Sequence, residues 1–233
     1  MKRLTHNFLV IEGNIGAGKT SLCHQLATEF DTRLVLEQFA DNPFLADFYA
    51  EPARHAFTVE LFFMAERYKQ LQDLLQERSR NQARNQPQNE IIAPQNEINA
   101  TQKQTIADYF FIKTLLFAGR TLEGNEFRLF KRFFKILNKT FPKPDLLVYI
   151  HRPVDALLQN IKKRGRDYEK DLSGEYLQNI ESAYFDYFKT DPDFPILFID
   201  VADKNYLDDK RIYAEIVIHI NKVYENGLHR VRL

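Results

Sequence analysis

The chain has 233 residues, 44% of them hydrophobic and 27% charged, which is typical of a globular protein with a sizeable core. Lys plus Arg and Asp plus Glu both total 32, so no overall positive field favours nucleic acid or an anionic membrane as a partner. The single cysteine, Cys23, excludes an intramolecular disulfide and a multi-cysteine zinc site. We therefore expect a small-molecule partner and a cytoplasmic location.

The first apolar run covers residues 8–11 and leads into a glycine-rich turn. It is too short for a secretion signal or a membrane span, and it suits a strand buried on both faces of a parallel sheet. Residues 19–30 then predict a helix, and a second buried strand over 34–36 ends just before Glu37. This order implies a right-handed crossover.

Later segments continue the alternation of helices and buried strands. Apolar residues at helical spacing predict helices over 57–77, 106–118 and 127–137. Residues 146–150 and 196–199 predict two further strands, Pro153 begins a helix, and 208–223 predict a closing helix. The fold class is α/β, a doubly wound parallel sheet with flanking helices, in one domain spanning residues 1–233.

Residues 77–104 interrupt this pattern with Asn, Gln and charged residues. Two seven-residue copies, PQNEIIA over 87–93 and PQNEINA over 94–100, follow each other directly. The segment has too little apolar surface to offset the entropy of ordering, so it is predicted to be a solvated loop insert without chemistry.

The glycine-rich turn matches the phosphate-loop pattern G-x-x-x-x-G-K-[ST], between a strand and a helix as its mechanism requires. Backbone N–H groups of such a loop surround phosphate oxygens, Lys19 neutralises their charge, and Thr20 offers a hydroxyl to Mg²⁺. The predicted ATP-binding residues are Gly13, Asn14, Ile15, Gly16, Ala17, Gly18, Lys19, Thr20 and Ser21.

The residues expected to bind the phosphoryl acceptor restrict the class of reaction that the protein could catalyse. No N-K-x-D motif for guanine is present, which disfavours a switch-type GTPase. Between Gln38 and Glu60 the only cation is Arg54, whereas a monophosphate acceptor needs several. The same stretch is rich in aromatic residues, including Phe48 and Tyr49, which suits an uncharged acceptor that carries a ring.

Two further groups fit phosphoryl transfer. Glu37, at the carboxyl end of a strand, is a candidate general base for an acceptor hydroxyl. The basic run over residues 162–166 follows a helix, and it predicts a lid that brings Arg164 and Arg166 onto the transferring phosphoryl group.

Together these motifs resemble the deoxynucleoside kinases related to deoxycytidine, deoxyguanosine and deoxyadenosine kinase, especially the bacterial deoxyadenosine/deoxyguanosine branch. The resemblance covers nearly the whole chain outside the insert. It rests on GNIGAGKT at 13–20, LEQ at 36–38, NPFL at 42–45, FYxxPxRxAF at 48–57, AERYKQ at 65–70 and KKRGRDYE at 162–169.

The resemblance implies a P-loop NTPase-like fold with an arginine lid, and it implies roles by position. Glu37 would activate the 5′-hydroxyl, and Tyr49 with Glu169 would hold the sugar 3′-hydroxyl. Arg67 would lie beside the base, and Tyr206 near a loop that covers the adenine of ATP.

The chain departs from the family pattern at two places. Where relatives commonly have Gln beside the base, this chain has Glu60, which when ionised only accepts hydrogen bonds. That residue favours a purine, and the resemblance places deoxyadenosine first and deoxyguanosine second.

The second departure replaces the family's E/D-R-S segment with residues 106–109. Alignment without a gap puts Asp108 at the arginine position and Lys113 at an aspartate position. With a one-residue gap, Asp108 becomes the acid beside the metal. Both alignments keep Asp108 in the site.

The resulting hypothesis is a deoxynucleoside kinase that uses ATP and Mg²⁺ and forms a homodimer through its long helices. One alternative is a thymidylate-type monophosphate kinase that prefers dTMP or dCMP. Another is a catalytically silent nucleotide-binding regulator, suggested by the missing arginine.

Overall fold

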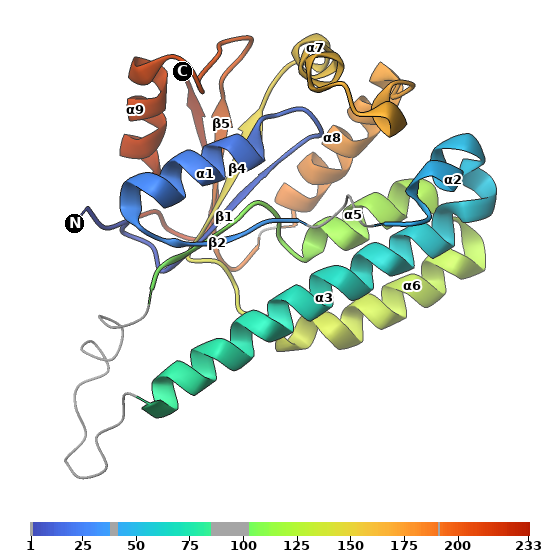
Figure 1. The fold of residues 1–233 in the computed structure, drawn as a ribbon, viewed down its shortest axis with the longest axis horizontal. Helices are drawn as coiled ribbons and strands as arrows, with labels where there is room; N and C mark the ends of the chain where they lie inside the picture. The colour runs from blue at the N-terminus through green and yellow to red at the C-terminus, as the bar shows by residue number, and fades with distance from the viewer. Residues whose placement is uncertain (1, 38–41, 85–102, 191) are drawn as a thin grey trace.

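The computed structural model describes residues 2–37, 42–84, 103–190 and 192–233. Within these ranges, six parallel strands form one sheet in the order β2-β3-β1-β4-β5-β6 (Figure 1). The strands are β1 (Phe8–Gly13), β2 (Arg33–Val35), β3 (Thr105–Ala107), β4 (Leu146–His151), β5 (Pro195–Asp200) and β6 (Gly227–Arg232). The strand order reverses beside β1, the place where ligands bind in such sheets. The predicted doubly wound parallel sheet is confirmed.

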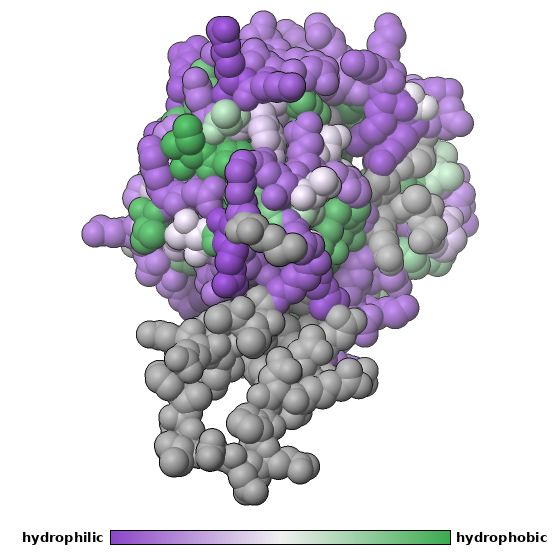
Figure 2. Space-filling view, turned by 60° about the vertical axis from the view of Figure 1, so that its left-hand side comes forward, coloured by the Kyte–Doolittle hydropathy of each residue, from purple (hydrophilic) through white to green (hydrophobic). Residues whose placement is uncertain are grey.

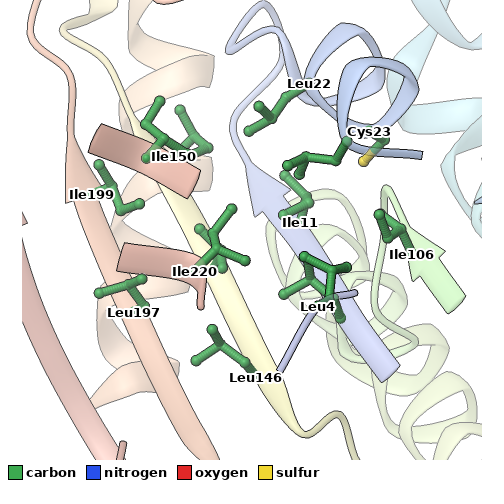
Figure 3. Packing of buried hydrophobic residues seen from close by; sticks show 14 of the residues in the cluster. Leu4, Ile11, Leu22, Cys23, Ile106, Leu146, Ile150, Leu197, Ile199 and Ile220 are labelled. Carbon is green, nitrogen blue, oxygen red and sulfur yellow. The ribbon is translucent and has the colours of Figure 1, made fainter. Parts of the chain in front are cut away.

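Successive side chains of the strands face two different cores. Leu9 and Ile11 point toward α1 (Lys19–Phe30) and α9 (Lys210–Ile220), in the aliphatic cluster shown in Figure 3. Phe8 and Val10 point to the opposite side, in a cluster with side chains of α8 (Gly174–Phe188). Because both faces of β1 are buried, its first four residues are continuously apolar, and Glu12, which follows them, is buried as well.

A third cluster joins helices beyond the sheet: α2 (Leu45–Ala50), α3 (Pro52–Arg84), α5 (Ile112–Thr121) and α6 (Gly124–Leu137). In Figure 1, α3 and α6 run side by side along the outer edge of this group. The rings of Phe111 and Phe134 stack with centroids 5.2 Å apart, which ties the start of α5 to α6. These helices form one wall of the site described below.

Several predicted elements need correction. The helix predicted over 106–118 is wrong at its start, because Thr105–Ala107 form β3 and α5 begins only at Ile112. The chain does not close with a helix over 208–223, because α9 ends at Ile220 and the edge strand β6 follows. Helices α2 and α8 were not predicted. Pro153 is the N-cap of α7 (Val154–Arg164).

The predicted insert also begins later than expected, because α3 continues to Arg84. Both seven-residue copies, 87–93 and 94–100, lie outside the described residues. On the face shown in Figure 2 the surface is mostly hydrophilic, with hydrophobic side chains in small groups. Among the described residues, no helix is both long enough and apolar enough to cross a membrane.

Candidate active site

The glycine-rich loop leaves β1 and turns into the start of α1. Gly16 and Gly18 have φ angles of +82° and +92°, which residues with a side chain rarely adopt. A Cβ atom on Gly16 would lie 2.7 Å from the carbonyl oxygen of Leu157, so only glycine fits there. The loop therefore keeps its backbone open in front of the α1 N-terminus, where unpaired N–H groups and the helix dipole favour a phosphate.

A pocket of about 760 Å³ opens at this loop, beyond the carboxyl ends of the strands. One part is lined by the loop and by basic residues: Gly16, Gly18, Lys19, Thr20, Arg152, Lys163, Arg164 and Arg166. Another part carries aromatic rings with two charged residues among them: Phe48, Tyr49, Phe63, Phe117, Tyr176, Glu60 and Arg67. The pocket thus combines a surface for phosphate with a surface for a ring.

Asp108, directly after β3, is hydrogen-bonded both to the phosphate loop that follows β1 and to Glu37, which follows β2. Its Oδ2 accepts a hydrogen bond from the hydroxyl of Thr20 at 2.8 Å. Its Oδ1 accepts one from the backbone N–H of Glu37 at 2.7 Å. Asp108 also lines the pocket, as both alignments expect, and its role beside a metal stays a prediction.

Glu37 is clamped by two cations. Arg67 donates to its Oε1 through Nε at 2.8 Å and Nη2 at 2.5 Å, and Lys113 Nζ lies 2.5 Å from its Oε2. All three side chains are nearly buried. Burial would raise the pKa of Glu37, but the positive charges of Lys113 and Arg67 outweigh it and hold that pKa well below its usual range. Glu37 is therefore ionised at neutral pH.

Lys19 lines the pocket, and its Nζ donates to the carbonyl oxygen of Asn14 at 2.9 Å. Burial, together with repulsion from Lys113, lowers the pKa of Lys19 to about 8, against the attraction of nearby carboxylates. A phosphate group at the loop would offset both effects, because it would add negative charge beside the ammonium group.

Glu60 belongs to the aromatic part of the pocket and is 4% exposed. Its Oε1 accepts a hydrogen bond from the hydroxyl of Thr121 at 2.9 Å. Burial raises the pKa of Glu60 to about 7, although the charge of Arg67 and the Thr121 hydrogen bond act in the opposite direction.

The two lid arginines converge on one carboxylate. Arg164, at the end of α7, donates from Nε and Nη2 to Oε2 of Glu169, and Arg166 Nη1 lies 3.3 Å from Oε1. Glu169 ends the short 3₁₀ helix η2 (Asp167–Glu169) and is 6% exposed. Tyr49 and Glu169, the pair that the resemblance assigns to the sugar, line the same pocket as the two arginines, and this role stays a prediction.

Three residues predicted to bind ATP lie at the loop but do not line the pocket. Tyr206 is fully buried, where its hydroxyl donates to the carbonyl oxygen of Ala17 at 2.7 Å, so it supports the loop from behind. Asn14 binds the carbonyl oxygen of Leu177, and Gly13 packs so closely on β4 that a Cβ would lie 2.6 Å from the Ile150 oxygen. These residues shape the loop and do not line the pocket.

Sequence reasoning missed other lining residues. Asn160 stands one turn before Lys163, which belongs to the predicted basic run, and Asn160 Nδ2 donates to the carbonyl oxygen of Gly16 at 2.8 Å. Arg152 directly follows β4 and stacks on the ring of Tyr206, with its guanidinium carbon 5.0 Å from the ring centroid. Arg152 could have been predicted as a site residue, because it follows a predicted strand at the edge of the sheet where ligands bind. Phe63 and Phe117 gave none, because their spacing is that of ordinary core residues.

Comparisons with known proteins agree on one family. The family model described as deoxynucleoside kinase matches residues 9–225. Deoxyguanosine kinase from Bacillus subtilis (strain 168) is 32% identical over 223 residues, covering 94% of this chain and 98% of the relative. Deoxyadenosine kinase from Dictyostelium discoideum is 31% identical over 189 residues, covering 81% and 69%.

The fold is similar to that of a solved deoxyadenosine kinase from M. mycoides with bound dATP. The TM-score is 0.70, the sequences are 18% identical, and the match covers 92% of this chain and 100% of the other.

Proposed function

The chain belongs to the deoxynucleoside kinase family and is an ATP-dependent phosphotransferase, and we propose that it phosphorylates the 5′-hydroxyl of a purine deoxynucleoside. One observation carries this proposal: the phosphate loop and the ionised carboxylate of Glu37 line the same pocket and are joined through Asp108. A hydroxyl group bound at Glu37 would have a proton acceptor beside it and the phosphoryl donor in the same pocket.

In the proposed reaction, the 5′-oxygen forms a bond to the γ-phosphorus of ATP. The bond from that phosphorus to the β,γ-bridging oxygen breaks, ADP leaves, and the hydroxyl proton passes to Glu37. The low pKa of Glu37 makes it a weak base, which suits a loose transition state in which the attacking hydroxyl loses its proton late. Arg67 and Lys113 fix its orientation.

Positive charge around the phosphoryl group would come from Lys19, the loop N–H groups, Arg164 and Arg166. The two arginines contact Glu169, the residue that the family resemblance assigns with Tyr49 to the 3′-hydroxyl. A sugar hydroxyl bound to Glu169 would therefore help to position both arginines. Acceptor binding and phosphate binding would be coupled through this one carboxylate.

Thr20 and Asp108 are the residues that would hold Mg²⁺. Both offer oxygen atoms, which Mg²⁺ prefers, and it usually takes its remaining ligands from water and nucleotide phosphates. The described residues contain no cluster of three or more His, Cys, Asp or Glu suited to a metal. When bound, Mg²⁺ neutralises charge on the phosphates.

A purine is supported by the aromatic part of the pocket and by the names of the two similar relatives, a deoxyguanosine kinase and a deoxyadenosine kinase. The order of preference, with deoxyadenosine first, stays a prediction.

We also propose a homodimer. Leu129, Phe133 and Ile136 are exposed on one stripe of α6, and Leu61 is exposed on the neighbouring α3. These apolar side chains would be buried between two copies of the long helices. Sedimentation that shows only monomers at micromolar concentration would contradict this.

The decisive test is an ADP-release assay with each deoxynucleoside and its monophosphate, with and without Mg²⁺. We expect Glu37→Gln to lower kcat by about 100-fold or more, with ATP binding retained, because the amide cannot take up the proton. Glu51→Gln, which changes an exposed glutamate, serves as the control and should match the wild type.

Each component of the proposal has its own contrary result. Wild-type turnover of Glu37→Gln would overturn the role of Glu37. A preference for dTMP or dCMP would favour a monophosphate kinase, and no ADP release with any acceptor would favour a regulator.

A further inference from the structure

Glu60 occupies an unusual place for a carboxylate. It is almost fully buried in the aromatic part of the pocket, and only Oε1 is held by the protein, through Thr121. Among the described residues, the hydrogen bond from Thr121 reaches Oε1, and none reaches Oε2. A carboxyl oxygen that faces a pocket from a buried side chain and has no hydrogen bond to the protein is suited to bind a polar group of the ligand.

Five charged or titratable side chains surround Glu60, each on a different segment of the chain. They are Arg67 on α3, Lys113 on α5, Glu37 after β2, Tyr176 on α8 and Tyr49 on α2. Arg67 and Lys113 both bind Glu37, so neither makes an ion pair with Glu60. Burial therefore dominates, and it raises the pKa of Glu60 to about 7. Both protonation states are accessible near neutral pH.

The two states have different hydrogen-bonding patterns. An ionised carboxylate only accepts, whereas a carboxylic acid also donates one hydrogen bond. The Watson–Crick edge of guanine presents two adjacent donors, N1–H and the N2 amino group, which suit the carboxylate. The same edge of adenine presents N1 as an acceptor beside the N6 amino donor, which suits the neutral acid.

We propose that Glu60 binds the Watson–Crick edge of the purine and that its protonation state sets the preference, with the carboxylate selecting deoxyguanosine and the carboxylic acid selecting deoxyadenosine. The inference rests on the proposed function and specifies its substrate. One active site would then accept both purines, and pH would change their ratio.

The first test measures kcat/KM for both purine deoxynucleosides between about pH 6 and about pH 8, which brackets the pKa of about 7. Their ratio is the informative quantity, because ionisations of Glu37, Lys19 and the phosphates affect both substrates alike. We expect the deoxyguanosine-to-deoxyadenosine ratio to rise by about tenfold or more with pH, the discrimination expected of a matched hydrogen-bond pair.

A fixed neutral side chain gives the matched comparison. In Glu60→Gln the ratio should no longer depend on pH, and at pH about 8 it should shift toward deoxyadenosine by about tenfold, because the amide presents one donor and one acceptor. Glu66→Gln removes the same charge from the same helix outside the pocket, and it should keep the wild-type dependence.

A second test measures the protons taken up or released when a substrate binds. It uses only the wild-type protein, so the outcome does not depend on how a variant folds. Calorimetry at pH about 7 in buffers of different ionisation enthalpy should show proton uptake with deoxyadenosine and proton release with deoxyguanosine.

Equal proton exchange, a ratio independent of pH, or a Glu60→Gln variant with wild-type dependence would overturn the proposal. Those results would leave the kinase assignment intact. The kinase assignment itself fails if no deoxynucleoside supports ADP release.

Discussion

At the scale of single residues, the second departure from the family pattern has physical counterparts in the structure. Asp108 meets Thr20, and Lys113 reaches Glu37 from the first turn of α5, so the clamp on Glu37 contains cations from α3 and α5. The sequence alone supported Asp108 in the site and left its role open between two alignments. A shift of one residue moves a side chain to another side of the backbone, and no local pattern distinguished the two.

Lys113 should matter for catalysis although it does not lie on the phosphate loop. We expect Lys113→Met to lower kcat by about 100-fold, because Glu37 would lose one of the contacts that orient it. Removing the cation should also raise the pKa of Glu37, so the acidic limb of the kcat profile should move to higher pH.

The conservative variant Lys113→Arg keeps the charge and should retain much of the activity with an unchanged acidic limb. If Lys113→Met loses activity but its pH profile does not move, the lysine acts through structure and not through the charge of Glu37.

At the scale of elements, the sequence predicted those with a strong local pattern. The bounds of α1 match the prediction, and the buried strands β1, β4 and β5 were found within two residues at each end. Strand β3 was missed because it offers only two consecutive apolar residues, Ile106 and Ala107, and Thr105–Ala107 form a strand only by pairing with β1 and β2. Strand β6 was missed because an edge strand that is half exposed lacks a continuous apolar run.

The cap of α9 offers a test at this scale. The carboxylate of Asp209 accepts hydrogen bonds from the backbone N–H groups of Arg211, at 2.8 Å, and Ile212, at 3.4 Å. We expect Asp209→Ala to lower the free energy of unfolding by about 1 kcal/mol, measured by urea denaturation. Asp209→Asn can still cap the helix and should lose much less. An equal loss in both variants would show that the cap does not stabilise α9.

At the scale of the whole molecule, the phosphate loop and the alternation of strands and helices were enough to predict a doubly wound sheet. The order of its strands was not predictable, because it depends on pairing between distant segments. Contacts between the sheet and the helices packed on it were not predictable either, for the same reason. His151 at the end of β4 binds Glu181 of α8 at 2.9 Å and Asp200 of β5 at 3.1 Å. The spacing of these three residues in the sequence does not predict that they meet.

This link should make stability depend on pH. The hydrogen bond to Glu181 raises the pKa of His151, against burial and with help from Asp200. A histidine whose folded pKa is raised contributes stability that is complete below its unfolded pKa of about 6.5 and lost as pH rises through the folded value.

We therefore expect the stability difference between wild type and His151→Gln to be larger at pH about 5.5 than at pH about 9. Chemical denaturation at both pH values measures it, and taking the difference removes the contributions of other groups. His24→Gln, which changes an exposed histidine of α1, is the control. A difference independent of pH would show that His151 does not titrate as a partner of these acids.

The position of β3 has a consequence for how the protein is made. This strand lies between β1 and β2, yet the ribosome synthesises it after both. Thr20 and Glu37 precede their shared partner Asp108 by 88 and 71 residues. A nascent chain that ends before Thr105 therefore carries the whole phosphate loop but lacks β3 and Asp108. The basic residues of the pocket on and after α7 are synthesised later still, so ATP would stabilise the finished sheet and leave half-made ones without support.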